Sequence, residues 1–135
     1  MAKETAKKVE QKEQEREPIT SIEIAGKSYD IHIGFAFIRE LDKRHPEAGV
    51  GAYGVGITSL MFMMEQRNPL GLLDFIQCAT VTAKQKPAVA DIEKEIEAWY
   101  EAGELEDYYE NFMHRLATSG MTAPTVELFL KETRG

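Results

Sequence analysis

The sequence predicts an α+β fold that is predominantly α, with an N-terminal β-hairpin packed on a bundle of about six helices. Before residue 34, apolar residues alternate with polar ones on either side of Gly26, which is the period of β-strands. From Phe35 onward the apolar spacing becomes three and four residues, which is the helical period. The chain has 135 residues, of which 43% are hydrophobic and 29% charged, as expected for one globular domain.

The hairpin and the first helix are predicted from this change of period. The alternating apolar residues of the hairpin are Ile22, Ile24, Tyr29, Ile31 and Ile33. A two-stranded hairpin is marginally stable alone, so we expect it to lie against helices. The first helix begins at Phe35 and ends before Pro46, which cannot continue it. Its predicted inward face holds Phe35, Phe37, Ile38 and Leu41.

Glycine and proline separate the next two helices. Residues 47–56 contain four glycines and are predicted to form a flexible connection, followed by a second helix over 57–66. Asn68 is a good N-cap directly before Pro69, and this pair is predicted to begin a third helix that runs to about Lys84. Because the third helix is apolar nearly all round, we expect it at the centre of the fold.

Three further helices are predicted toward the C-terminus. The fourth begins at Pro87 and ends at Gly103, the fifth ends at Gly120, and Pro124 opens the last. The predicted inward residues of the fourth are Val89, Ile92, Ile96, Trp99 and Tyr100. Those of the last two are Leu105, Tyr108, Tyr109, Phe112, Leu116, Val126, Phe129 and Leu130.

Charge is distributed unevenly along the chain. Residues 1–17 carry five basic and five acidic groups and little apolar surface, so we expect residues 1–18 to form a frayed or disordered tail and residues 19–135 a single domain. Residues 88–110 carry nine acidic groups against one lysine, which accounts for the net charge of −7. This stretch is either the solvated face of two helices or a surface for a basic partner, and the overall sign disfavours nucleic acid.

Motifs for catalysis, cofactors and metals are weak. Residues 49–54 fit G-x-G-x-x-G, but they follow a predicted helix rather than a strand, and Asp74 falls within a helix, so nucleotide binding is not predicted. The three histidines lack metal-ligand spacing, and Cys78 is expected to be buried and inert. No apolar run reaches the length of a membrane span, and no secretory signal is present. We therefore predict no catalytic, cofactor, metal or membrane site.

The second helix suggests a binding surface. Ile57, Leu60, Met61 and Met64 share one face, while Phe62 and Met63 are also apolar and point well away from it. Exposed methionine and aromatic side chains suit a surface that accepts varied apolar partners. The alternative is that Phe62 and Met63 pack under the glycine-rich connection or against the hairpin.

Residues 24–31 (IAGKSYDI) and 34–43 (GFAFIRELDK) resemble the tail assembly chaperones of long-tailed bacteriophages and prophages of Gram-positive bacteria. The resemblance continues through the glycine-rich connection, Asn68-Pro69-Leu70 and the acidic helices, and covers about residues 22–130. It implies a non-enzymatic protein like the lambda-type chaperones, which bind the tape measure protein, keep it soluble, and help the tail tube protein to polymerise around it. Some relatives gain a further domain by a frameshift; none follows Gly135, so we expect the short form.

The resemblance also implies where the protein acts and what it binds. We expect it in the cytoplasm of the bacterial host and not in the mature virion, bound to the tape measure protein, the tail tube protein and copies of itself. The open strand edges of the hairpin would serve self-association. The candidate partner-binding residues are Met61, Phe62, Met63, Met64, Glu93, Glu97 and Glu101.

Two other functions compete with this interpretation. A small helical DNA-binding regulator is the main alternative, although no predicted helix carries a basic stripe. A small enzyme is the third, and only the glycine-rich connection favours it.

Overall fold

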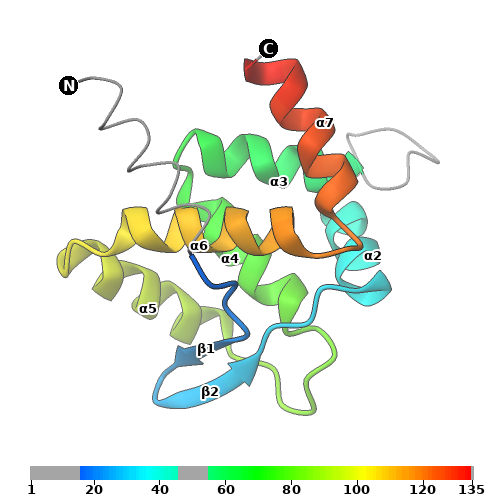
Figure 1. The fold of residues 1–135 in the computed structure, drawn as a ribbon. Helices are drawn as coiled ribbons and strands as arrows, with labels where there is room; N and C mark the ends of the chain where they lie inside the picture. Colours follow the sequence, from blue (N-terminus) through cyan, green and yellow to red (C-terminus); the bar gives the residue numbers. More distant parts are fainter. Residues whose placement is uncertain (1–15, 46–54, 135) are drawn as a thin grey trace.

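The fold is a two-stranded hairpin followed by six helices, in a computed structural model that describes residues 16–45 and 55–134 (Figure 1). The elements are β1 (Ser21–Ile24), β2 (Lys27–Asp30), α2 (Phe35–Arg44), α3 (Val55–Glu65), α4 (Pro69–Ala79), α5 (Val89–Glu101), α6 (Leu105–Thr118) and α7 (Ala123–Arg134). The predicted fold class is therefore confirmed.

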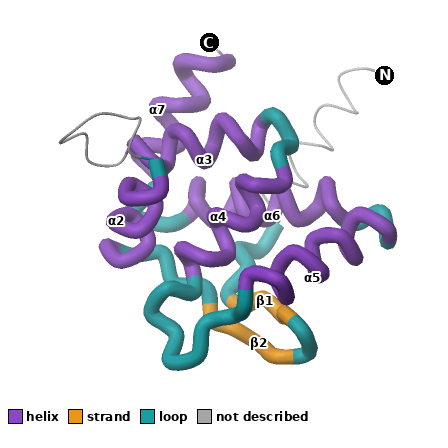
Figure 2. Tube along the Cα trace, turned by 180° about the vertical axis from the view of Figure 1, so that it is seen from behind, coloured by secondary structure: helices purple, strands orange, loops and turns teal. Residues whose placement is uncertain are grey.

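The hairpin forms as the alternation predicts. β1 and β2 are antiparallel, with Ile22 opposite Tyr29 and Ile24 opposite Lys27. The two turn residues, Ala25 and Gly26, both have positive φ, as the tight turns favoured in hairpins require. The hairpin lies at one end of the molecule beside α5 (Figure 2), where the Ala25 amide donates to Glu95 Oε1 at 2.8 Å.

Helix α4 is central, as predicted. It contacts α2, α3, α5 and α6, and its side chain Phe75 lies between two other aromatic rings. The Phe75 ring is 5.8 Å from that of Phe37 and 4.2 Å from that of Phe112, and Trp99 stacks on Tyr108 at 3.6 Å. These rings connect α2, α4, α5 and α6 in one core.

Helix α4 is shorter than predicted. It begins as expected, because the Asn68 side chain accepts a hydrogen bond from the Leu70 amide and Pro69 occupies the first turn. It ends at Ala79 rather than near Lys84. Thr80, Val81 and Thr82 are β-branched and weak helix formers, and the Ala79 carbonyl accepts from the His32 amide after the hairpin.

Three residues predicted on inward faces are exposed, namely Phe35, Val89 and Tyr100. Phe35 and Val89 are the first residues of their helices, beyond the point where the helix meets the core. Tyr100 lies at the far side of a stripe whose centre, Ile92, Ile96 and Trp99, is buried. Apolar spacing alone therefore assigned more residues to these inward faces than the fold buries.

Two predicted flexible segments are described only in part. Residues 1–15 and 46–54 lie outside the described residues, and so does the G-x-G-x-x-G pattern. Arg16, which the prediction placed in the tail, donates a hydrogen bond to Asn111 on α6. Gly56, which it placed in the flexible connection, belongs to the first turn of α3, and its amide donates to Asp42 Oδ1 at 2.9 Å.

Candidate functional site

Helix α3 divides the four predicted binding residues between the core and the surface. Met61 and Met64 are buried, with 1% and 0% of their surface exposed, so they contribute to the core and not to an exposed surface. Phe62 is 53% exposed, and Met63 is half-buried. The split arises because α3 packs against α2, α4, α6 and α7, which leaves only a narrow strip of the helix uncovered.

The exposed strip of α3 borders an open depression. Its lining residues are His45, Thr58, Ser59, Phe62, Met63, Asn68 and Phe129. No hairpin residue is among them, and neither strand is among the elements that contact α3 extensively. The glycine-rich connection, under which the alternative prediction placed Phe62 and Met63, lies largely outside the described residues. We refer to Phe62 and Met63 as the α3 surface.

The acidic residues of α5 lie in two different environments. Glu93, Glu97 and Glu101 are exposed and recur every fourth residue, which places them on one face of the helix. Within the described part of the chain, none of the three has a hydrogen bond or ion pair. Glu95 points to another side and accepts the hydrogen bond from the hairpin turn.

Two of the three acidic residues of α6 are paired instead. Arg67, in the turn before α4, donates hydrogen bonds to Glu106 and Glu110 and lies 5.5 Å from the centre of the Tyr109 ring. The hydrogen bond from Arg67 lowers the pKa of Glu106 and raises that of the guanidinium. In the stretch over 88–110, Glu106 and Glu110 on α6 are therefore paired, whereas Glu93, Glu97 and Glu101 on α5 have no partner within the described residues.

The structure adds Leu70 to the candidate residues. It lies in the first turn of α4, is 59% exposed, and lines a groove with Glu93 and Glu97. The apolar character of α4 predicted a central helix, which gave no sign that this position would be exposed. The Asn68-Pro69 start signal could have indicated it, because side chains in a first turn often precede the buried part of a helix.

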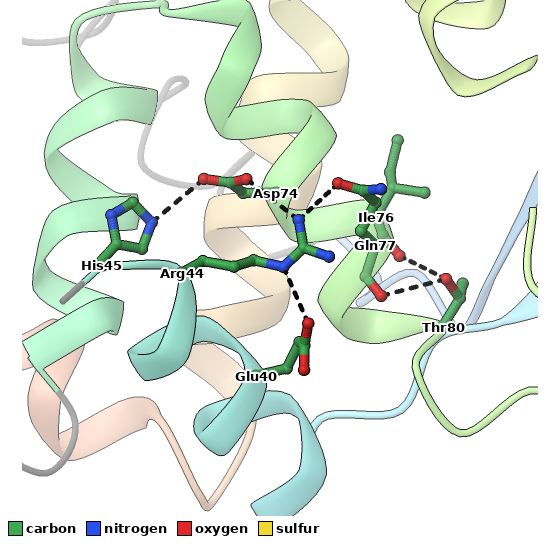
Figure 3. A network of polar contacts seen from close by, with 7 residues as sticks. All are labelled: Glu40, Arg44, His45, Asp74, Ile76, Gln77 and Thr80. Atoms are coloured by element: carbon green, nitrogen blue, oxygen red, sulfur yellow. Dashed lines mark hydrogen bonds and ion pairs between the residues drawn. The ribbon is translucent and has the colours of Figure 1, made fainter. Parts of the chain in front are cut away.

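A half-buried polar network joins α2 to α4 (Figure 3). The Arg44 guanidinium lies within 3.3 Å of Glu40, 3.7 Å of Asp74 and 2.6 Å of Gln77. His45 Nε2 lies 3.2 Å from Asp74 Oδ2. Asp74 thus holds two helices together, which is a structural role and not the one that a nucleotide-binding motif would require.

The described residues offer little for catalysis or metal binding. Cys78 is fully buried, as predicted, and burial raises the pKa of its thiol to about 12, so little of the reactive thiolate forms near neutral pH. Across residues 16–45 and 55–134, no group of three or more His, Cys, Asp or Glu could hold a metal ion. In the same ranges no helix is long and apolar enough to span a bilayer.

The described residues thus form a small helical domain in which Phe62 is exposed on α3 and the exposed Leu70 lies beside Glu93 and Glu97. A family model for the phage tail assembly chaperone protein, TAC, matches residues 21–131. The chain therefore belongs to the phage tail assembly chaperone family, and the resemblance seen in the sequence is confirmed. Searches of curated proteins and of solved structures gave no match. Membership implies a chaperone role in tail assembly, not a catalytic one.

Proposed function

We propose that this chain binds the tape measure protein, keeps it soluble, and assists polymerisation of the tail tube around it. Family membership supports a role in tail assembly. The observation that carries the finer proposal is the α3 surface. Phe62 is exposed there, whereas Ile57, Leu60, Met61 and Met64 of the same helix are buried. Burial of Phe62 and its neighbour Met63 against a partner would remove apolar surface from water, which favours binding.

The geometry suits a carrier that must later release its cargo. The α3 surface is small and includes a methionine, which adapts to varied apolar partners because its side chain is unbranched. A small adaptable surface gives moderate affinity, whereas a deep rigid pocket would hold a partner too tightly for hand-over. The net charge of −7 also opposes aggregation of the chaperone itself.

Three further parts of the proposal follow from this role. The tail tube protein is a second partner, which the chaperone brings to the tape measure protein. Copies of the chain associate along the cargo, with the open edges of the β1–β2 hairpin as the contact. The protein acts in the cytoplasm of the host and is absent from the finished particle.

Co-expression with the tape measure protein of the same phage or prophage tests this function. We expect the chaperone to raise the soluble fraction of the tape measure protein and to co-purify with it. The variant Phe62→Ser/Met63→Ser should lose most of this effect. The control is Leu128→Ser, which changes an exposed apolar residue on α7 and should keep the effect. An unchanged soluble fraction with the native chain would refute the function, and an unchanged effect in the double variant would refute the α3 surface.

A further inference from the structure

A groove runs between the start of α4 and the outer side of α5, helices that lie side by side (Figure 1). Its volume is about 240 Å³, and it is lined by Pro69, Leu70, Leu73, Glu93, Ile96 and Glu97. Leu70 is exposed, Leu73 is half-buried and Ile96 is buried. The groove therefore has an apolar floor formed by both helices and a carboxylate rim contributed by α5.

Local structure holds the α4 side of this groove in place. The Asn68 side chain accepts from the Leu70 amide at 3.1 Å, and the ring of Pro69 fixes the backbone torsion of the first turn. Before it, the Asn68 amide donates to the Met63 carbonyl at 2.9 Å, closing the turn from α3. Leu70 is thus presented on a rigid helix start, so little ordering entropy is lost when a partner covers it.

The charge of the rim specifies the partner. Glu93 and Glu97 have no ion pair or hydrogen bond within the described residues, in contrast with Glu95, which binds the hairpin turn. A partner with carboxylates would be repelled, and a purely apolar one would desolvate both groups without compensation. A partner with lysine or arginine beside its apolar residues would pair with the rim while it covers Leu70.

The shape of the surface indicates a helical partner. Val89 and Tyr100 are both exposed, and their spacing places them on the same side of α5 as Glu93 and Glu97. From Val89 to Tyr100 this side extends over about 16 Å, or three turns of helix. An amphipathic helix lying along α5 could place one apolar residue per turn over this length.

We propose that the α4–α5 groove binds an amphipathic helix in which lysine or arginine residues flank an apolar stripe. The inference rests on the proposed function, because it names the kind of segment that the chaperone would hold. The groove is separate from the α3 surface, so the two can be tested independently.

A synthetic peptide tests the groove directly. The probe is a labelled peptide of about 18 residues, five turns of helix, with leucines at helical spacing and lysines on both sides of the stripe. Fluorescence anisotropy would measure its Kd with the full chain. We expect binding that weakens as salt is raised from about 50 to 300 mM, since the rim contacts are exposed. The same peptide with glutamate in place of lysine should not bind.

Matched variants separate the groove from a general surface effect. Leu70→Ser should raise the Kd about tenfold, and Glu93→Gln/Glu97→Gln should raise it several-fold and flatten its salt dependence. Leu128→Ser matches the first variant, because Leu128 is 58% exposed and Leu70 59%. Glu127→Gln/Glu132→Gln on α7 matches the second, and neither control should change the Kd. The glutamate variants keep the test valid if Leu70→Ser does not fold.

The outcomes distinguish this inference from the proposed function. Equal binding of the glutamate peptide, or equal losses in the groove and control variants, would overturn the groove. If the groove variants also fail to keep the tape measure protein soluble in co-expression, the results support both the groove and the proposed function. If the groove variants bind the peptide as the native chain does, while the native chain still keeps the tape measure protein soluble, the results support the function and place the binding site elsewhere.

Discussion

Helices α3 and α5 both carry residues that the sequence marks for partner binding, but the fold uses the two helices differently. On α3, Met61 and Met64 enter the core and Phe62 remains outside. On α5, all three candidate glutamates are exposed. The difference lies in the surroundings, because α3 packs against four helices whereas the contacts of α5 are mainly with α4, α6 and β1.

The comparison shows what kind of pattern identifies a surface. Charged residues at a spacing of four on α5 must face water unless they are paired, so the sequence alone located them. On α3 nearly every residue is apolar, but Ile57, Leu60, Met61 and Met64 recur at the helical spacing of one face, and that face is the buried one. The apolar residues outside it, Phe62 and Met63, are those left available to a partner.

The largest effect on the free energy of unfolding should distinguish the buried side of α3 from its exposed side. Met64→Ala removes a fully buried side chain and should lower the free energy of unfolding by about 2–5 kcal/mol. Phe62→Ala removes an exposed one and should change it by less than about 0.5 kcal/mol. Urea unfolding followed by circular dichroism measures both, and similar losses in the two variants would contradict the division of α3.

The next effect on stability concerns the close contact between α3 and α2. A Cβ atom on Gly56 would lie 2.8 Å from the Leu41 carbonyl carbon and 2.9 Å from the Asp42 amide nitrogen, both of which are backbone atoms of α2. Gly56→Ala should therefore cost about 1–3 kcal/mol through overpacking. Gly120→Ala is the control, since a Cβ there meets nothing within 4 Å. Equal melting temperatures for the two variants would show that α2 and α3 are not in close contact.

A pH effect should report on α4, which lies between α3 and α5. The pKa of Cys78 is raised to about 12 in the folded chain, whereas an unfolded thiol ionises near 9. Between these values the unfolded state releases a proton that the folded state keeps, so stability falls as pH rises. The free energy of unfolding should fall more steeply with pH in the native chain than in Cys78→Ala, by up to about 1.4 kcal/mol per pH unit. Identical slopes, or native alkylation of Cys78 at pH 8, would contradict its burial.

The smallest effect should distinguish two faces of α5. Glu95→Ala removes the acceptor for the Ala25 amide and should cost about 0.5–1.5 kcal/mol. Glu93→Ala removes a carboxylate without a described partner and should leave stability nearly unchanged. Chemical denaturation of both variants makes the comparison. A larger loss from Glu93→Ala would mean that Glu93 supports the fold rather than the surface.

Local signals predicted the fold well. The alternation around Gly26 gave the hairpin, and Asn68-Pro69 gave the start of α4, because strand alternation and helix capping depend on neighbours in the sequence. The end of α4 was wrong by about one turn, since a hydrogen bond from His32, far away in the chain, helps to terminate it at Ala79.

The candidate site was less predictable. Glu93, Glu97 and Glu101 are exposed as expected, and Phe62 remains available. Met61 and Met64 share the helical face of Ile57 and Leu60 and are buried with it, so they are wrong as binding residues although the spacing had marked that face. The groove that includes Leu70 was missed entirely, because α4 and α5 each contribute half of it and no single segment carries its pattern.

The most direct test of the account is site-specific photo-cross-linking to the tape measure protein. Benzoylphenylalanine can replace Phe62 on the α3 surface, Tyr100 on the outer side of α5, and Leu128 on α7, all of which are exposed. The account predicts cross-links to the tape measure protein from positions 62 and 100 and none from 128. Cross-linking from position 128 alone, or equally from all three positions, would contradict it.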